Sequence, residues 1–109
     1  MELRIVLVTT NNQEEARKIA QAVLEARLAA CVNILPAVES HFWWQGQLSE
    51  AKEILLLVKS SMEHHEALTQ TILRNHSYAC PEIVTLSPDQ VSPAYRQWWE
   101  VMLAELQPV

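Results

Sequence analysis

Two residues in one loop have side chains that bind transition metals. His76 offers a neutral imidazole, which suits Cu(II) or Zn(II), and Cys80 follows it by four residues with a soft sulfur ligand. A single histidine makes a weak site, so further ligands would have to come from the same cleft or from other subunits. The alternatives are a loop histidine that hydrogen-bonds a neighbour and a loop cysteine without a further role.

A second group of polar residues stands beside strongly apolar runs, where charged side chains need partners. The group combines acids, a base and a phenol, which could perform proton chemistry if one cleft gathered them: Glu53, Lys59, Tyr78 and Glu82. The functional interpretation is a binding cleft shared between subunits, with Trp44 beside it. The other interpretation, which we prefer, is a set of interface hydrogen bonds and ion pairs that fixes the register of an oligomer.

The remaining histidines and cysteine have more ordinary interpretations. Cys31 lies among small apolar residues and is predicted to be a buried structural residue rather than a reactive thiolate. His64 and His65 are adjacent on a predicted helix, so their side chains point about 100° apart and cannot easily share a metal ion. We expect both to be solvated. His41 falls near the end of a predicted hairpin, where it could contact another subunit.

The longest regular pattern runs from Leu28 to Lys59 and predicts two long strands joined by a tight turn. Gly46, the only glycine of the chain, lies at the reversal, where a positive φ angle is needed. Pro36 interrupts the first strand, which indicates an edge position or a bulge. A chain of 109 residues should not leave the aromatic end of this hairpin uncovered, so we expect a partner subunit to cover Phe42, Trp43 and Trp44.

Two helices flank this hairpin in the sequence. Residues 3–9 predict a strand buried on both faces. Asn12 and Glu15 then begin a helix that is predicted to end near Arg27, with that basic residue in its last turn. After the hairpin, a capping box formed by Ser60 and Glu63 predicts a second helix that ends near residue 75.

The order of the elements, β-α-β-β-α-β-α, is that of the split-βαβ, ferredoxin-like arrangement within the α+β class. The last strand is predicted at 82–86, and the last helix opens with Pro93. We expect one domain over residues 1–109, with two helices on one face of an antiparallel sheet. Only the last helix remains for the other face, which again indicates an oligomer. The apolar stripe of that helix is expected to contain Tyr95, Trp98, Trp99, Met102 and Leu106.

Composition argues against several classes of partner. The net charge is −5 and the eight basic residues are scattered, whereas binding to nucleic acid needs clustered Lys and Arg. No apolar run approaches the length of a membrane span. The N-terminal residues lack the basic region and cleavage site of a signal peptide, so the cytosol is the expected compartment. Two cysteines without a CxxC pair signal neither a zinc cluster nor a redox dithiol.

Several motifs, in order and over nearly the whole chain, resemble those of the CutA divalent-ion tolerance family. They are LAACVNI at 28–34, Trp44-Gln45-Gly46, Glu53-Ile54-Leu55 running into Val58-Lys59, Tyr78-x-x-Pro81-Glu82, and Tyr95 with Trp98. The resemblance implies a tight homotrimer in which the hairpins pair across subunits, similar in shape to the PII signalling trimers. It also implies a role in tolerance of copper and other divalent ions, and it carries over no enzymatic reaction.

The chain departs from the family pattern in three places. Val8 stands where some relatives have a cysteine that is a proposed copper ligand. Asn75 and Ser77 flank the loop histidine where the family sometimes has a second histidine and often has a proline. The turn at 87–90 lacks the usual glycine, which affects local geometry only. The first two departures predict that Cu(II), or another divalent cation, is not tightly bound.

We therefore expect a homotrimeric, cytosolic, non-enzymatic protein of the divalent-metal (copper) response. The alternative is a PII-like trimer that binds a small ligand or an unknown partner protein in its intersubunit clefts. A third possibility is an acylphosphatase-like hydrolase, which would need a phosphate-binding loop, usually with glycine and arginine. The loop after the first strand, at 9–12, reads TTNN and has neither residue, which argues against this enzyme.

Overall fold

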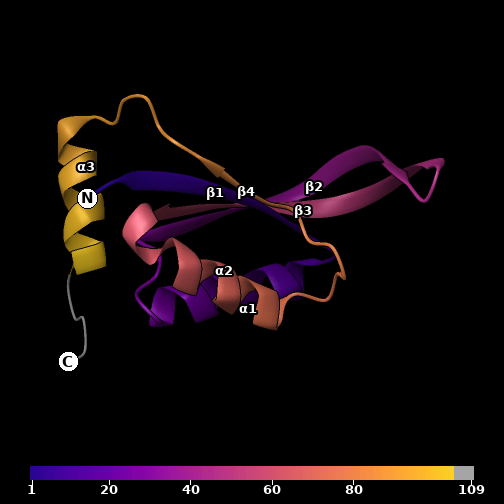
Figure 1. Ribbon diagram of the computed structural model, residues 1–109, viewed down its shortest axis with the longest axis horizontal. Coiled ribbons are helices and arrows are strands. Elements are labelled where there is room, and N and C mark those ends of the chain that lie inside the picture. Colours follow the sequence, from indigo (N-terminus) through magenta and orange to yellow (C-terminus); the bar gives the residue numbers. More distant parts are fainter. Residues whose placement is uncertain (105–109) are drawn as a thin grey trace.

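The computed structural model describes residues 1–104, which form a four-stranded sheet and three α-helices (Figure 1). The elements are β1 (Leu3–Thr10), α1 (Gln13–Glu25), β2 (Cys31–Trp44), β3 (Gln47–Ser61), α2 (His65–Asn75), β4 (Ile83–Leu86) and α3 (Pro93–Ala104), with a 3-10 helix at Met62–His64. The sheet is antiparallel, with strand order β2-β3-β1-β4. This arrangement confirms the predicted ferredoxin-like α+β fold.

One face of the sheet packs against α1 and α2, which lie side by side along it (Figure 1). Side chains alternate along a strand, so every second residue of β1 and β3 points to this face. The core consists of strand residues and of helix residues spaced three or four apart: Val6, Val8, Leu56, Val58, Ile19, Val23, Leu68 and Ile72. These side chains are fully buried, and burying each is worth about 1.5–3 kcal/mol relative to exposure.

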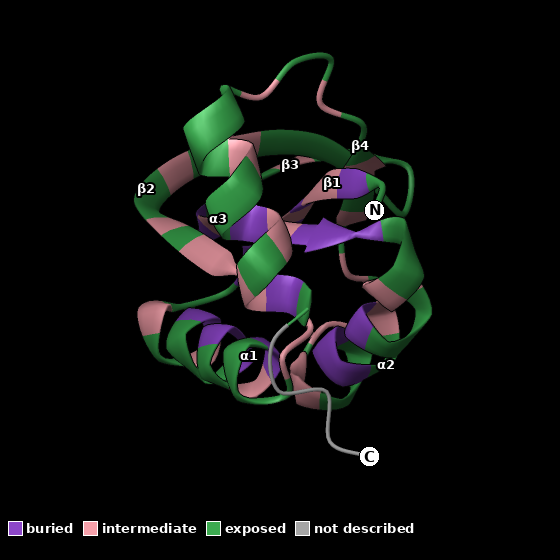
Figure 2. Cartoon of the chain, turned by 90° about the vertical axis from the view of Figure 1, so that its left-hand side faces the viewer, coloured by how far each residue is buried: buried purple, intermediate pink, exposed green. Residues whose placement is uncertain are grey.

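The opposite face of the sheet is covered by α3 at one end only (Figure 1), and α3 lies in front of the sheet when the molecule is viewed from that end (Figure 2). Leu3, Trp99 and Leu103 form a small buried cluster there. The Trp99 Nε1–H donates to the Ser60 carbonyl oxygen at 3.0 Å, which fixes α3 to the end of β3. Beyond α3 this face carries exposed apolar residues, Leu35, Val84 and Leu86, so it is incompletely covered, as the sequence led us to expect.

The apolar stripe predicted for α3 is only partly buried. Trp99 is buried, whereas Tyr95 and Trp98 are exposed at 36% and 40%. Leu103, which we did not assign to the stripe, is fully buried instead. Leu106 lies outside the described residues. The exposed members leave α3 with apolar surface that faces away from its own chain.

The hairpin of β2 and β3 projects beyond the helices (Figure 1). Gln45 and Gly46 have φ angles of 49° and 78°, so both central residues of the turn are left-handed, as a type I′ turn requires. This confirms the role predicted for Gly46. The register shifts beside Pro36, where Ala37 has a φ angle of 62°, and this confirms the predicted bulge on an edge strand.

The first helix begins and ends close to where we predicted, but its last turn differs from the prediction. The Asn12 side chain accepts a hydrogen bond from the Glu15 N–H at 2.8 Å, as expected of an N-cap. The helix ends near Arg27, as predicted, with Glu25 as its last residue, but the prediction of a basic residue in its last turn was wrong, because that turn contains none. Arg27 has a φ angle of 58°, and the Leu28 N–H donates to the Val23 carbonyl oxygen at 3.0 Å. This is a Schellman ending, with Arg27 in the position that glycine usually takes.

The capping box predicted at Ser60 and Glu63 does not form, because β3 stays paired with β1 through this region. The Ser60 hydroxyl donates to the Leu28 carbonyl oxygen at 2.6 Å instead. The backbone N–H of Glu63 itself, and then that of Glu2, hold the pKa of the Glu63 carboxyl below its ordinary value. The second helix therefore starts only after the 3-10 turn, although it ends where we predicted.

Candidate functional site

A cavity of about 670 Å³ lies between the hairpin and the loop that precedes β4. One side is formed by hairpin residues that strand alternation and pairing place on a common face. The other side is formed by the loop. The cavity gathers predicted site residues that are far apart in the sequence: Trp44, Glu53, Tyr78, Cys80 and Glu82. Phe42, which we expected at the subunit interface, also lines it.

Glu53 is the buried acid of this cavity, with 8% of its surface exposed. The Tyr78 hydroxyl donates a hydrogen bond to the Glu53 Oε2 at 2.9 Å. Burial of the phenol, followed by this hydrogen bond and by the negative charge of Glu53, raises the pKa of Tyr78 to about 12. The phenol therefore remains protonated at neutral pH and acts as a hydrogen-bond donor.

Lys59 lies outside this cavity. Its ammonium donates to the Tyr95 hydroxyl at 3.0 Å, at the end of the sheet that α3 covers. Cys31 lies opposite Lys59 in the pairing of β2 with β3. The prediction that Cys31 is buried was wrong, because the sheet face around it is only partly covered and the residue is partly exposed.

His76 lies in the predicted loop, but its ring has no exposed surface. Its Nε2 lies 2.7 Å from the Thr9 carbonyl oxygen, and its Nδ1 accepts a hydrogen bond from the Tyr78 N–H at 3.1 Å. A carbonyl oxygen only accepts, so the proton is on Nε2 and the imidazole is neutral. The 3.3 Å contact between Nδ1 and Glu15 is then not an ion pair. A metal ion could bind His76 only by displacing one of these hydrogen bonds.

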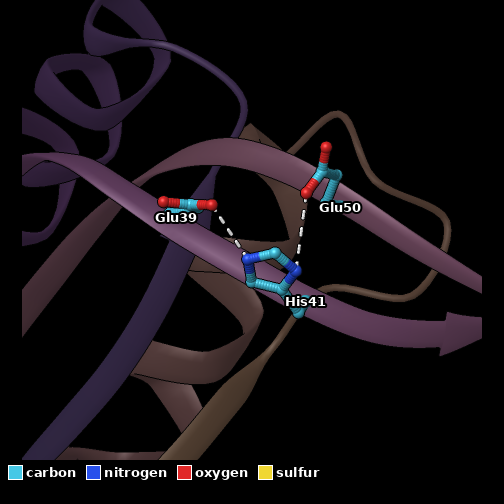
Figure 3. A group of neighbouring side chains, drawn as sticks. All are labelled: Glu39, His41 and Glu50. Atoms are coloured by element: carbon cyan, nitrogen blue, oxygen red, sulfur yellow. Dashed lines mark hydrogen bonds and ion pairs between the residues drawn. The ribbon is translucent and has the colours of Figure 1, made fainter.

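A different group of possible metal ligands lies on the opposite face of the hairpin (Figure 3). The His41 Nε2 lies 2.9 Å from the Glu39 Oε1, and the His41 Nδ1 lies 3.5 Å from the Glu50 Oε2. One ligand atom from each residue lies within 4.8 Å of the other two. Within residues 1–104, this is the only group of three or more His, Cys or acidic side chains so arranged. His76 and Cys80 therefore belong to no such group.

The sequence contained a signal for this cluster that we did not use. Residues pair outward from a two-residue turn at Gln45 and Gly46, and this places His41 opposite Glu50. Glu39 precedes His41 by two residues and so lies on the same face. We expected His41 only at a subunit contact, because we considered its position in its own strand and not which residue of the next strand pairs with it.

The prediction that His64 and His65 are solvated was also wrong. The His64 Nδ1 lies 2.6 Å from the Ser61 hydroxyl oxygen. The His65 Nε2 lies 2.6 Å from the Thr85 hydroxyl oxygen, which joins the start of α2 to β4. Both histidines are half-buried structural links. The partner of His64 is only three residues away in the sequence, whereas the partner of His65 comes from the packing of α2 beside the sheet.

Sequence comparison matches nearly the whole chain to one family. The family model described as CutA1 divalent ion tolerance protein matches residues 4–101. The divalent-cation tolerance protein CutA of Thermus thermophilus is 43% identical over 94 residues, which cover 86% of this chain and 91% of that protein. The chloroplastic CutA 1 of Oryza sativa is 36% identical over 94 residues, and there the match covers only 53% of the relative's length.

Solved structures agree with this result. The crystal structure of CutA1 from Oryza sativa matches with a TM-score of 0.90 at 33% identity and covers 96% of each chain. The CutA of Archaeoglobus fulgidus, described as a periplasmic divalent cation tolerance protein, matches with a TM-score of 0.88 at 32% identity and covers 93% of this chain and 98% of that one. Family model, sequence identity and fold confirm the resemblance seen in the motifs, and the chain belongs to the CutA1 divalent ion tolerance family.

Proposed function

We propose that this protein takes part in divalent-cation tolerance by binding the cation, Cu(II) or another divalent ion. Membership of the family supports the role, and the Glu39–His41–Glu50 cluster supports binding as its basis. The His41 ring lies between two carboxylates, with its nitrogens 2.9 Å from the Glu39 Oε1 and 3.5 Å from the Glu50 Oε2. A cation bound to the imidazole would therefore also have carboxylate oxygens within reach.

The ligand set of this cluster fits a divalent cation of borderline softness. An imidazole nitrogen with carboxylate oxygens suits Cu(II) or Zn(II). One nitrogen of His41 would hold the ion together with a carboxylate, while the other ring N–H donates to the second carboxylate, an arrangement that orients metal-bound histidines. The three side chains are 60–71% exposed, which supports our expectation that the ion is not tightly bound.

Calorimetric titration of the metal-free protein with Cu(II) and with Zn(II) tests this proposal. His41→Gln should weaken binding about 100-fold or more, since changes even beyond the direct ligands of a metal cost about 10–100-fold. His76→Gln and Cys80→Ser are the controls, because both residues lie outside the cluster. Binding that survives His41→Gln but is lost in either control would contradict this site and favour the loop that the sequence first suggested.

The residues around the cavity support binding rather than catalysis. The raised pKa of Tyr78 keeps its phenol protonated, so Tyr78 is not a general base at neutral pH. Lys59, the base in the predicted proton chemistry, lies with Tyr95 and away from Glu53. An acyl-phosphate hydrolysis assay should therefore detect no activity, and turnover abolished by Glu53→Gln would contradict a purely binding role.

We propose that the chain assembles as a homotrimer through the open face of the sheet and the tip of the hairpin. Monomeric soluble proteins rarely expose large contiguous apolar patches. The hairpin tip exposes Trp43 and Leu48 at 70% and 71% and also exposes Phe42 and Trp44, which flank the turn at Gly46. The open sheet face adds Leu35, Val84 and Leu86, each exposed at 40–45%.

Native mass spectrometry with and without stoichiometric Cu(II) tests the assembly. We expect a trimer that takes up a multiple of three copper ions. Val84→Glu should shift the protein towards monomers, because Val84 is exposed in the single chain but would be buried by a partner on this face. A wild-type monomer would refute the trimer, whereas a trimer with scattered excess copper would refute the metal site alone.

We propose the cytosol as the compartment in which the protein acts. Among residues 1–104, no helix combines the length and apolarity needed to cross a membrane. The similar structure from Archaeoglobus fulgidus is described as periplasmic. Fractionation of the native host, with antibody detection, should find this chain among cytosolic proteins, and its release with a periplasmic fraction would contradict the proposal.

A further inference from the structure

Apart from His41, the residues that line the cavity between the hairpin and the loop before β4 have no part in the metal proposal, and they indicate a different ligand. We infer that it binds an organic ammonium cation, with Glu53 as the counter-ion and aromatic rings as walls. His41 borders this cavity as well. The buried acid and the aromatic residues nevertheless belong to the opposite face from the Glu39–His41–Glu50 cluster, so this inference does not depend on metal binding.

Glu53 supplies a negative charge that no described side chain neutralises. Only 8% of its surface is exposed, and the Tyr78 hydroxyl donates one hydrogen bond to it. Within residues 1–104, no nitrogen of a Lys, Arg or His side chain lies within 4.0 Å of its carboxylate. A buried charge without an opposite partner is costly. A ligand that brings a positive charge into the cavity would offset that cost.

The lining selects for a cation and against an anion. Among the described residues no Lys or Arg lines the cavity, whereas Glu53 and Glu82 both do. Nucleotides and other phosphates would therefore meet only negative charge. Tyr78 adds aromatic surface, as do Phe42 and Trp44, which we also propose as subunit contacts, and the faces of aromatic rings attract ammonium groups. The volume of about 670 Å³ falls within the usual range of about 300–1,000 Å³ for small-molecule sites.

A bare metal ion fits this cavity less well than an organic cation. Metal ions need several ligand atoms at short distance. Glu53, Cys80 and Glu82 line the same space, yet within residues 1–104 they do not form a group whose ligand atoms lie within 4.8 Å of one another. An ammonium group surrounded by carbon needs only one nearby carboxylate and apolar contact, and both are present.

Choline and its neutral carbon isostere, 3,3-dimethylbutan-1-ol, form a matched pair of probes. The two have similar shapes and differ mainly in the positive charge. Titration of the full-length isotope-labelled protein, followed by NMR with EDTA present, should show choline shifting the signals of Glu53 and Tyr78. The isostere should bind at least about tenfold more weakly, the factor expected for loss of one charge-assisted contact. Equal affinity for the two probes, or no shift at these residues, would overturn the inference.

Two Glu→Gln variants, each of which removes a charge and keeps the size of the side chain, test whether Glu53 is the counter-ion of choline. Glu53→Gln should weaken choline binding at least about tenfold, since it removes the charge and keeps the size of the side chain. Glu66→Gln, on the exposed surface of α2 and outside the cavity lining, is the control and should leave choline binding unchanged. Equal losses in the two variants would overturn the assignment to Glu53.

Tyr78→Phe provides an independent test if Glu53→Gln does not fold. This variant keeps the aromatic ring but removes the hydrogen bond to Glu53, so the carboxylate is freer to face a cation. Choline should bind as tightly as to the wild-type protein or more tightly. A tenfold loss would overturn the inference.

Discussion

The two faces of the projecting hairpin carry the same kind of side chain in opposite surroundings. Glu50 and Glu53 are three residues apart on β3, and strand alternation sends them to opposite faces. Glu50 is 71% exposed and lies beside an imidazole, whereas Glu53 is 8% exposed and lies beside a phenol. Residue type alone therefore does not define the chemistry of either site.

Burial explains why a cation needs several protein side chains on one face of the hairpin and a single carboxylate on the other. Water weakens each charge on the exposed face, so a cation there requires Glu39, His41 and Glu50 together. On the buried face, Glu53 loses most of its contact with water, and a single uncompensated carboxylate exerts a strong field. We therefore expect the two faces to respond independently to mutation.

The largest expected effect is that each of two variants loses the binding of one ligand, the metal ion or choline, and keeps the binding of the other. Glu50→Gln should weaken Cu(II) or Zn(II) binding about 10–100-fold and leave choline binding unchanged. Glu53→Gln should weaken choline binding and leave metal binding unchanged. Calorimetry of both variants with both ligands checks this pattern. If each variant lost both ligands, the two faces would form one site and the comparison would fail.

A mutation at the turn should affect both faces together. Gly46 has a φ angle of 78°, and a side chain there would meet no neighbouring atom within 4 Å. Gly46→Ala should therefore destabilise the protein by about 1–2 kcal/mol, through the cost of a left-handed conformation alone. Chemical denaturation at a fixed protein concentration measures this change. An unchanged midpoint would show that the turn does not hold the register shared by the two faces.

The ionisation of Tyr78 reports on the buried face. Its pKa is raised from 10.0 to about 12, first by burial and then by Glu53. The folded state thus favours the protonated phenol, and the stability that this contributes is complete below pH 10 and is lost between pH 10 and about 12. In Glu53→Gln, the pKa should fall below the wild-type value but stay above 10.0, because burial remains.

Ultraviolet titration in a Tyr95→Phe background measures the pKa of Tyr78 alone, since the chain has two tyrosines. Glu50→Gln in the same background is the control and should leave the titration unchanged. A pKa that did not respond to Glu53→Gln would show that the carboxylate does not act on the phenol.

The smallest expected effect is on stability at the exposed face. Glu39 and His41 are 69% and 60% exposed, and surface ion pairs of this kind contribute about 0–1 kcal/mol. Glu39→Gln should therefore change the unfolding free energy of the metal-free protein by less than about 1 kcal/mol. A larger loss in denaturant unfolding would mean that the cluster is structural and would weaken its assignment as a metal site.

The sequence by itself determined the order of the elements, the ferredoxin-like fold and the family. These features depend on local patterns: apolar runs for the strands, the Asn12 cap for α1, and the one glycine at the turn. It also named four residues around Glu53 that the fold gathers in one cavity: Trp44, Tyr78, Cys80 and Glu82. Their selection followed from polar side chains beside apolar runs and from the family motifs.

Only the tertiary structure decided what each of those side chains contacts. The end of β3 pairs with β1, and this pairing overrode the local capping signal at Ser60. The packing of the loop against β1 turned His76 into a buried link, and the pairing across the turn brought His41 between two acids. Such contacts join residues distant in sequence, and the free energy of burial and hydrogen bonding that selects them exists only once the chain has packed.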